Sequence, residues 1–462
     1  MSARTLTAEM IDFDGAFAAR QPKANTLTEA SHAERFARAY GGEFRFDHRR
    51  NLWLAWQGGT WREDRTGLRY TRAVTLARRL FHDSASEPDL AARSRMAQFA
   101  IACESRHRID NVLALVRFQP PISNSGEDWD RDPWLLNTPG GVIDLRTGES
   151  RPARPEDLLL LQTAVAPAAK AECPRWQQFL TEVFGGDQPV VDWLHRFLGY
   201  AMTGDTGEQI FLIGYGTGAN GKSTLFGTVE NVLGSYAFNL PFSAMELHAR
   251  SSIPNDLAAI VGRRFVTASE SGDTVRLNEA RIKMLTGGDT VTARFLHGEF
   301  FEFRPAAKFV LFTNAKPTVR DDSLGMWRRI RLVPFLQTFE VNRTLGAELT
   351  AEGPGILRWM IDGCLAWQRD GLLTPNAVLT ATQAYRADSD LLEQFLDAKC
   401  VLGQTENCRA GELFARYREW ADAEGLGPRE RLNQRRFGSK IKERFDSMAD
   451  NKGIRYLGVG LS

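Results

Sequence analysis

The pattern of apolar residues between 209 and 335 predicts short strands that alternate with helices. Two runs, 210–213 and 309–312, are apolar throughout and have the length of a buried strand. Segments with helical spacing separate these strands. This order is typical of a mostly parallel sheet with helices packed on its faces. We therefore predict an α/β fold for this part of the chain.

The residues before this region predict a mixture of hairpins and helices. Residues 51–61 indicate a hairpin with its aromatic side chains on one face. Residues 73–81 and 90–101 have helical spacing, and residues 135–145 are typical of a strand, a tight turn and a second strand. Residues 174–203 contain two apolar helical stripes separated by a pair of glycines. We expect this last stretch to be two helices.

Residues 340–400 return to helical spacing, and a small separate domain is predicted over about 404–462. Two apolar stripes mark helices in that domain. They are Leu413, Tyr417 and Trp420 in the first helix, and Phe437, Ile441 and Phe445 in the second. Basic residues surround the second stripe, and a short strand at 455–459 follows it. A basic helix followed by a strand fits a winged helix, whose second helix commonly lies along DNA. The alternative is an ordinary solvated basic helix.

Composition and charge limit the classes of function. The 462 residues carry 58 basic and 57 acidic side chains, a net charge of +1, so any nucleic-acid site must be a local patch. The five cysteines form no CxxC pair and the seven histidines have no metal-ligand spacing, which argues against a disulfide framework and a zinc site. No apolar stretch approaches the roughly 20 residues of a membrane span, and the N-terminus lacks a signal-peptide core. We expect a cytoplasmic protein without membrane contact.

The strongest local signal is a glycine-rich loop at residues 216–223, which fits the pattern GxxxxGK followed by Ser or Thr. A strand pattern precedes the loop at 209–214, and a helical pattern follows it at 224–233. In this geometry the backbone amides at the helix N-terminus face phosphates, and Lys222 reaches the β and γ phosphates. The Ser223 hydroxyl can bind magnesium. The alternative is a glycine-rich turn without a ligand.

We therefore predict a site for ATP and Mg²⁺. The residues expected to bind ATP are Gly216, Thr217, Gly218, Ala219, Asn220, Gly221, Lys222, Ser223 and Thr224.

A predicted strand at 264–270 ends in Glu270, which is 48 residues after Lys222. A glutamate at the carboxyl end of a strand can orient and deprotonate an attacking water. It can also contribute to the magnesium site. The usual pair of acidic residues would place a second one at Ser269, which is not acidic. The alternative is a glutamate that merely ends a strand.

Two further motifs follow. The strand at 308–314 ends in Asn314, whose amide could sense the γ-phosphate or hold the water; the alternative is an asparagine in a turn. A Trp-Arg-Arg sequence at 327–329 precedes another strand. Arg328, or Arg329 beside it, could stabilise transition-state charge on a neighbouring subunit's nucleotide. The alternative is a surface arginine.

These motifs, in this order, resemble the superfamily 3 helicases. The likeness is to the helicase part of phage and plasmid primase–helicases, which are related to the poxvirus primase–helicase. It covers about residues 130–400 and includes the motif at 283–294. The resemblance implies a Walker A lysine and hydroxyl at Lys222 and Ser223, a Walker B acid at Glu270, sensor 1 at Asn314 and an arginine finger at Arg328, with Arg329 as the alternative.

The resemblance also implies where DNA binds. Residues 290–303 match a hairpin that projects into the channel of a ring, with its tip at 295–298. The family often has a lysine at this tip, and this sequence has none, so His297 and Arg294 would have to make the contact; a solvent-facing His297 is the alternative. The residues expected to contact DNA are Lys283, Arg294, His297, Arg435, Arg436 and Lys440.

The resemblance implies an AAA+-type P-loop core within an α/β chain of six parts. They are an N-terminal arm (1–30), an N-terminal α/β domain (31–165), a helical collar (166–204), the ATPase core (205–340), a helical connection (341–400) and a winged-helix-like DNA-binding domain (401–462). Too few residues precede the core for a complete primase domain.

The resulting hypothesis is an ATP-dependent DNA helicase or translocase of a phage, plasmid or other mobile element in a bacterial cytoplasm. A hexameric ring would act on single-stranded or forked DNA with the 3′ to 5′ polarity general in this superfamily. A separate primase or origin-binding protein would be a partner. The alternatives are a DNA-bound ATPase switch that does not unwind and a relative repurposed for defence or interference. An ordinary P-loop kinase is disfavoured by the hairpin, the Trp-Arg-Arg motif and the basic C-terminal helix.

Overall fold

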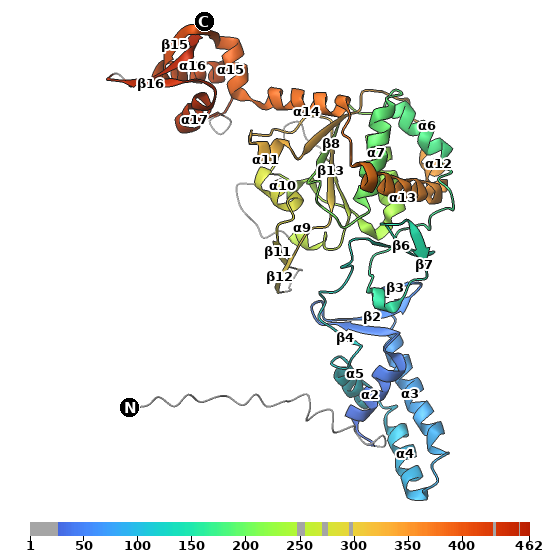
Figure 1. Ribbon diagram of the computed structural model, residues 1–462. Coiled ribbons are helices and arrows are strands. Elements are labelled where there is room, and N and C mark those ends of the chain that lie inside the picture. Colours follow the sequence, from blue (N-terminus) through green and yellow to red (C-terminus); the bar gives the residue numbers. More distant parts are fainter. Residues whose placement is uncertain (1–25, 247–254, 270–275, 295–298, 428–430, 452) are drawn as a thin grey trace, which may run out of the picture. The chain divides into compact units, whose positions relative to one another are not determined.

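The computed structural model describes residues 26–246, 255–269, 276–294, 299–427, 431–451 and 453–462 (Figure 1). The chain divides into two compact units. The first contains the residues up to 131 together with 153–160, and the second contains 132–152 and 161–462.

The first unit combines a four-stranded sheet with helices. Its elements are α2 (Glu29–Tyr40), β1 (Phe44–Asp47), β2 (Leu52–Gln57), β3 (Thr60–Glu63), α3 (Leu68–Ser84), α4 (Leu90–Ala102), α5 (Arg106–Val116), β4 (Ser123–Asn124) and the short turn η1 (Pro155–Asp157). The strand order is β3-β2-β1-β4. Trp56 and Trp61 lie opposite each other across β2 and β3, so the predicted aromatic hairpin is confirmed. Phe36, Phe44 and Val116 are fully buried in its core.

The second unit begins with a small antiparallel sheet and two helices. They are β5 (Leu135–Thr138), β6 (Gly141–Asp144), β7 (Glu149–Arg151), α6 (Pro174–Val183) and α7 (Gln188–Ala201). Helix α7 packs against α13 (Gly353–Asp370), and glycines allow the two backbones to come very close. A Cβ on Gly199 would lie 2.1 Å from the Cys364 nitrogen, and one on Gly363 would lie 2.2 Å from the His195 oxygen. Only glycine fits at either position.

A five-stranded sheet forms the centre of this unit. Its elements are β8 (Phe211–Tyr215), α8 (Lys222–Leu233), η2 (Gly234–Tyr236), β9 (Ala237–Asn239), η3 (Phe242–Ala244), α9 (Asn255–Ala258), β10 (Phe265–Ser269), α10 (Glu279–Thr286), β11 (Val291–Arg294), β12 (Phe300–Phe303), β13 (Lys308–Thr313), α11 (Leu324–Trp327) and β14 (Ile330–Pro334). The strand order is β14-β8-β13-β10-β9, and every neighbouring pair is parallel. The predicted parallel α/β sheet is confirmed.

The rest of the second unit consists of helices and a small three-stranded sheet. Its elements are α12 (Leu345–Ala351), α13, α14 (Asn376–Ser389), α15 (Leu391–Lys399), β15 (Cys400–Arg409), α16 (Ala410–Ala423), α17 (Gln434–Arg444), β16 (Ser447–Asp450) and β17 (Gly453–Leu461). Helix α14 leads to the C-terminal part, where the strand order is β15-β17-β16 (Figure 1). Tyr417, Phe437 and Ile441 are buried together, as their spacing predicts.

The structure divides the chain into two units, whereas the sequence predicts six parts. The finer division into six parts stays a prediction. One boundary differs in place: residues 132–152, grouped above with the N-terminal domain, belong to the second unit. The predicted arm at 1–30 lies almost wholly outside the described residues. Among the described residues, no helix is both long enough and apolar enough to cross a membrane.

Two buried cations anchor the amino ends of adjacent strands. Arg264, directly before β10, donates hydrogen bonds to the carbonyl oxygens of Met202 (2.7 Å), Leu135 (2.7 Å) and Asp132 (3.1 Å). Lys308, the first residue of β13, donates to carbonyl oxygens that include that of Asp205 at 3.0 Å, and burial holds its pKa well below the usual range. Backbone carbonyls thus hold both cations, and Arg264 ties the sheet to β5 and to the end of α7.

Replacing Arg264 with methionine should destabilise the second unit by about 3 kcal/mol, because buried carbonyl groups lose their donors. Urea unfolding followed by tryptophan fluorescence would measure the change. Arg343→Met is the matched control, since Arg343 is exposed. An equal shift in the two variants would contradict the anchoring role.

Candidate functional site

The loop between β8 and α8 has the backbone geometry of an anion cradle. Gly218, Ala219 and Gly221 have φ values of 105°, 47° and 85°. Turns of this kind direct successive amide groups into one concavity, which suits a phosphate. A Cβ on Gly216 would lie 2.3 Å from the Phe335 oxygen, so glycine is required there. No side chain of the described residues caps the amide groups at the start of α8, and they remain available to an anion.

Lys222 lies under this loop, and only 4% of its surface is exposed. Its Nζ donates to the Gly216 carbonyl at 2.6 Å, the Asn220 Oδ1 at 2.9 Å and the Asn314 Oδ1 at 3.4 Å. Burial lowers the pKa of the ammonium group to about 8. Among the described residues, the hydrogen-bond acceptors recorded for this ammonium group are neutral oxygens, an arrangement that a phosphate would improve.

Asn314 reaches Lys222 because of the order of the strands. It follows β13, which pairs in parallel with β8, and Thr313 lies opposite Tyr215 in the register. The carboxyl ends of both strands therefore meet at one edge of the sheet. The structure thus brings together two residues that the sequence analysis assigned to the same site, 92 positions apart. The catalytic role of each remains a prediction.

Glu270 lies outside the described residues. Strand β10, which leads to it, ends at Ser269 opposite Phe312 of β13. Sequence reasoning missed a polar contact that fixes this strand to the helix of the loop. Thr267 in β10 is fully buried and donates to the Glu230 carboxylate on α8, and Asn239 donates to the Thr267 hydroxyl at 3.0 Å. A threonine within the apolar run 265–268 was the available signal.

The two candidate finger arginines have different environments. Arg329 is buried, and its Nε donates to the Thr286 hydroxyl at 3.1 Å. Burial, together with the nearby charge of Arg328, lowers its pKa. Arg328 is exposed and donates to the Gln209 Oε1 at 2.5 Å. A structural role therefore suits Arg329, and only Arg328 presents its side chain at the surface.

Both arginines lie at the amino end of the sheet. They directly precede β14, and the Phe211 amide at the start of β8 donates to the Arg329 carbonyl at 2.8 Å. The glycine loop follows the other end of β8. A strand of that length spans about 15 Å. Arg328 and the loop of the same chain are therefore at opposite edges of the sheet.

The predicted hairpin at 290–303 has its two strands, β11 and β12, paired antiparallel with Arg294 opposite Phe300. Arg294 is exposed, and its guanidinium lies 5.5 Å from the Phe300 ring centroid. The predicted tip and His297 lie outside the described residues. The hairpin extends away from the sheet (Figure 1).

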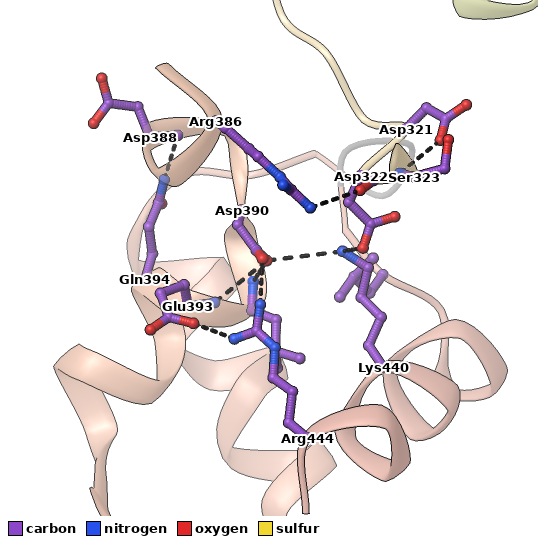
Figure 2. A network of polar contacts seen from close by, with 12 residues as sticks. Asp321, Asp322, Ser323, Arg386, Asp388, Asp390, Glu393, Gln394, Lys440 and Arg444 are labelled. Carbon is purple, nitrogen blue, oxygen red and sulfur yellow. Dashed lines mark hydrogen bonds and ion pairs between the residues drawn. The ribbon is translucent and has the colours of Figure 1, made fainter. Parts of the chain in front are cut away.

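Three of the residues expected to contact DNA line one cleft of about 510 Å³ between α10 and α17. They are Lys283, Arg436 and Lys440. Lys283 forms an ion pair with Asp321, and Lys440 forms one with Asp322 at 2.7 Å (Figure 2). Arg435 is exposed and is not one of the lining residues. The cations of the cleft are thus already neutralised in part by acidic side chains.

Comparisons with known proteins find two matching families and several similar viral proteins. A family model described as "D5 N terminal like" matches residues 33–185, and a family of unknown function, DUF5906, matches residues 214–329. A protein of Acanthamoeba polyphaga mimivirus named as a putative helicase is 26% identical over 63% of this chain. A protein named as a putative primase from African swine fever virus is 24% identical over 54% of it. The chain is thus similar to viral proteins of which one is named a putative helicase and the other a putative primase. The resemblance predicted from the motifs is thus confirmed.

The chain spans only part of the viral proteins it matches. It covers 33% of the mimivirus protein and 29% of the African swine fever virus protein. Both come from large DNA viruses of eukaryotes, so the bacterial host expected above stays a prediction. The apo structure of the NrS-1 C-terminal region is 12% identical, with a TM-score of 0.52 over 96% of this chain and 100% of that one. That likeness concerns the fold alone.

The affinity for ATP should fall as pH rises above about 8. The Lys222 ammonium titrates near that pH in the free protein, and a bound phosphate raises its pKa, so binding then requires uptake of a proton. The expected loss is about tenfold per pH unit. Titration calorimetry at about pH 7 and about pH 9 would measure it. Lys222→Ala should bind weakly with a flat profile, and a flat profile for the unaltered protein would contradict the assignment.

Proposed function

We propose that this chain is the motor part of an ATP-dependent DNA helicase or translocase that serves DNA replication. The observation that carries the proposal is the convergence of Lys222 and Asn314 beneath a glycine loop at the carboxyl edge of a parallel sheet. The names of the viral relatives support a helicase- or primase-type role. Because the chain spans about a third of their length, the activity of the whole protein is also part of the proposal.

In this mechanism, the loop amides and Lys222 hold the β and γ phosphates of ATP. Ser223, which is exposed at the start of α8, and Glu270 would hold Mg²⁺. Glu270 also orients the attacking water, and Asn314 holds that water or the γ-phosphate. The contact of β10 with α8 through Thr267 and Glu230 would keep the strand that leads to Glu270 in register with the loop. When bound, Mg²⁺ neutralises charge that develops on the phosphates.

Placement of Arg328 favours an oligomer. Since Arg328 and the loop of the same chain are at opposite edges of the sheet, this arginine cannot reach its own nucleotide. It could reach the nucleotide of a neighbouring subunit in a head-to-tail ring, where each interface joins the carboxyl edge of one sheet to the amino edge of the next. A hexamer that moves 3′ to 5′ along DNA, as the resemblance implies, is the form we propose.

The hairpin that carries Arg294 and the C-terminal part supply the proposed contacts with DNA. Arg294 lies on the exposed hairpin, and its stacking on Phe300 leaves a flat surface suited to a base or a phosphate. The three-stranded sheet with α16 and α17 has the order of elements expected of a winged helix. The surface cations of α17 would then add to the grip on DNA.

ATP hydrolysis and strand displacement on a forked DNA test the function directly. Lys222→Ala and Glu270→Gln should each reduce both activities at least about 100-fold, because phosphate binding or activation of water is lost. Asn231→Ala, at an exposed position on the same helix, is the control for folding. Hydrolysis without displacement would favour the DNA-bound switch, and hydrolysis by Lys222→Ala would refute the site.

Mixing two inactive variants tests the shared site. Arg328→Ala retains its loop and Lys222→Ala retains its arginine, so a 1:1 mixture should regain activity at about a quarter of the interfaces in a ring. The ATPase rate of the mixture, compared with the two variants alone, measures this recovery. Arg329→Ala should instead lower stability. Lack of recovery after subunit exchange would contradict an arginine supplied by a neighbour.

Hairpin variants separate translocation from hydrolysis. Arg294→Ala and His297→Ala should reduce strand displacement about tenfold or more while ATPase activity stays within about twofold, since neither residue belongs to the nucleotide site. The control is Arg304→Ala, an exposed arginine just after β12. Normal displacement by both hairpin variants would remove this hairpin from the mechanism.

A further inference from the structure

A set of ion pairs joins α17 to two other parts of the second unit. Lys440 Nζ lies 2.7 Å from Asp322 Oδ2 and 3.7 Å from Asp390 Oδ1. Arg444 pairs with Asp390 and with Glu393. Figure 2 shows Asp390 at the centre of this network, between the two basic side chains. We call the set Asp322, Asp390, Glu393, Lys440 and Arg444 the latch.

The centre of the latch is more enclosed than an ordinary surface ion pair, whereas its outer carboxylates, Asp322 and Glu393, are 45% and 48% exposed. The side chains of Lys440 and Asp390 are each only 16% exposed, and that of Arg444 is 32% exposed. Reduced contact with water strengthens the attraction between the charges. A hydrogen bond of 3.3 Å from Arg386 on α14 to the Asp322 carbonyl adds a further link (Figure 2).

Asp322 occupies a sensitive place in the chain. It lies between Asn314 and Arg328, in the segment that connects the proposed γ-phosphate sensor with the proposed finger. Its neighbour Asp321 holds Lys283 on α10. Helix α17 thus contacts the segment that joins Asn314 to Arg328. In the proposed ring, a change at the nucleotide of one subunit would pass along this segment to the arginine that serves the neighbouring subunit.

The latch also occupies cations that DNA would need. Lys440 and Arg436 lie on the face of α17 that lines the cleft. Arg276, Lys283 and Arg320 line the same cleft from other parts of the chain. Acidic side chains of the same cleft, Glu279, Asp321, Asp322 and Glu443, nearly balance these charges. DNA competes well with carboxylates for such cations. Binding of a cation to DNA releases condensed counterions, whereas binding to a single carboxylate does not.

We propose that the latch is an autoinhibitory contact that the DNA backbone opens. Phosphates displace Asp322 and Asp390 from Lys440 and Arg444, α17 leaves the segment 315–327, and that segment is released to position Arg328. The inference rests on the proposed function, because it requires that the chain bind DNA and hydrolyse ATP.

Asp322→Asn and Asp390→Asn test the latch, separately and together. Asparagine removes the charge and preserves shape, and at position 390 it can still accept the hydrogen bonds from the Leu392 and Glu393 amides that begin α15. The matched control is Asp450→Asn, which removes the same charge from an ion pair with Arg409 inside the C-terminal part. Thermal unfolding of each variant would verify that it is folded.

The double variant should bind single-stranded DNA about tenfold more tightly than the unaltered chain, roughly threefold for each carboxylate removed, as fluorescence anisotropy would measure. Asp450→Asn should change affinity less than about twofold. ATPase activity of the double variant without DNA should rise to the DNA-stimulated rate of the unaltered chain. Hydrogen exchange in α17 and in residues 315–327 should increase in the unaltered chain when DNA is added, and should be high in the double variant without it.

The outcomes separate the two proposals. If the unaltered chain neither binds DNA nor hydrolyses ATP in a manner that needs Lys222, both are overturned. If it does both, and the latch variants match Asp450→Asn in affinity, rate and exchange, only the latch is overturned.

Discussion

The parallel pairing of β8 with β13 on one side and β14 on the other determines where each candidate residue lies. Because all the strands run in one direction, the glycine loop after β8 and Asn314 after β13 meet at the same edge. The same constraint places Arg328, which precedes β14, at the far edge. In the proposed mechanism, this single strand direction separates the nucleotide site of a chain from the arginine of the same chain. Assembly of subunits would bring the arginine of one chain to the nucleotide of the next.

Burial distributes charge within this framework in a consistent way. At the amino edge, Arg264 and Lys308 are held by carbonyl oxygens and serve the packing of the sheet. At the carboxyl edge, Lys222 is also held by neutral oxygens, yet it lies beside a loop whose positive φ angles suit the binding of an anion. The buried side chains of Arg264, Lys308 and Lys222 thus have similar hydrogen-bond acceptors, but the first two stabilise the packing of the sheet and the third is the proposed phosphate ligand. What separates Lys222 from the other two is the backbone beside it.

The sequence predicts the parts of this arrangement whose signals are local. An apolar strand, a glycine loop and a helix are adjacent in the chain, so Lys222 and the flanking elements are predictable from a window of about 25 residues. The strand order is not local, and no pattern in the sequence places β13 beside β8. Arg328 and Arg329 are adjacent and chemically identical, and only the burial of Arg329 against Thr286 on α10 distinguishes them. The pairing of Lys440 with Asp322 joins residues 118 positions apart, and the boundary at 132–152 likewise depends on contacts distant in sequence.

The close approach of α7 and α13 has a consequence for motion. Each backbone fills the space that a side chain on Gly199 or Gly363 would need, so the two helices cannot slide past each other without a clash. Although more than 150 residues separate the two helices in the chain, we expect them to move together as one rigid unit. Under the proposed function, a movement driven by nucleotide exchange would therefore have to occur in the loops and hinges that join these two helices to the sheet.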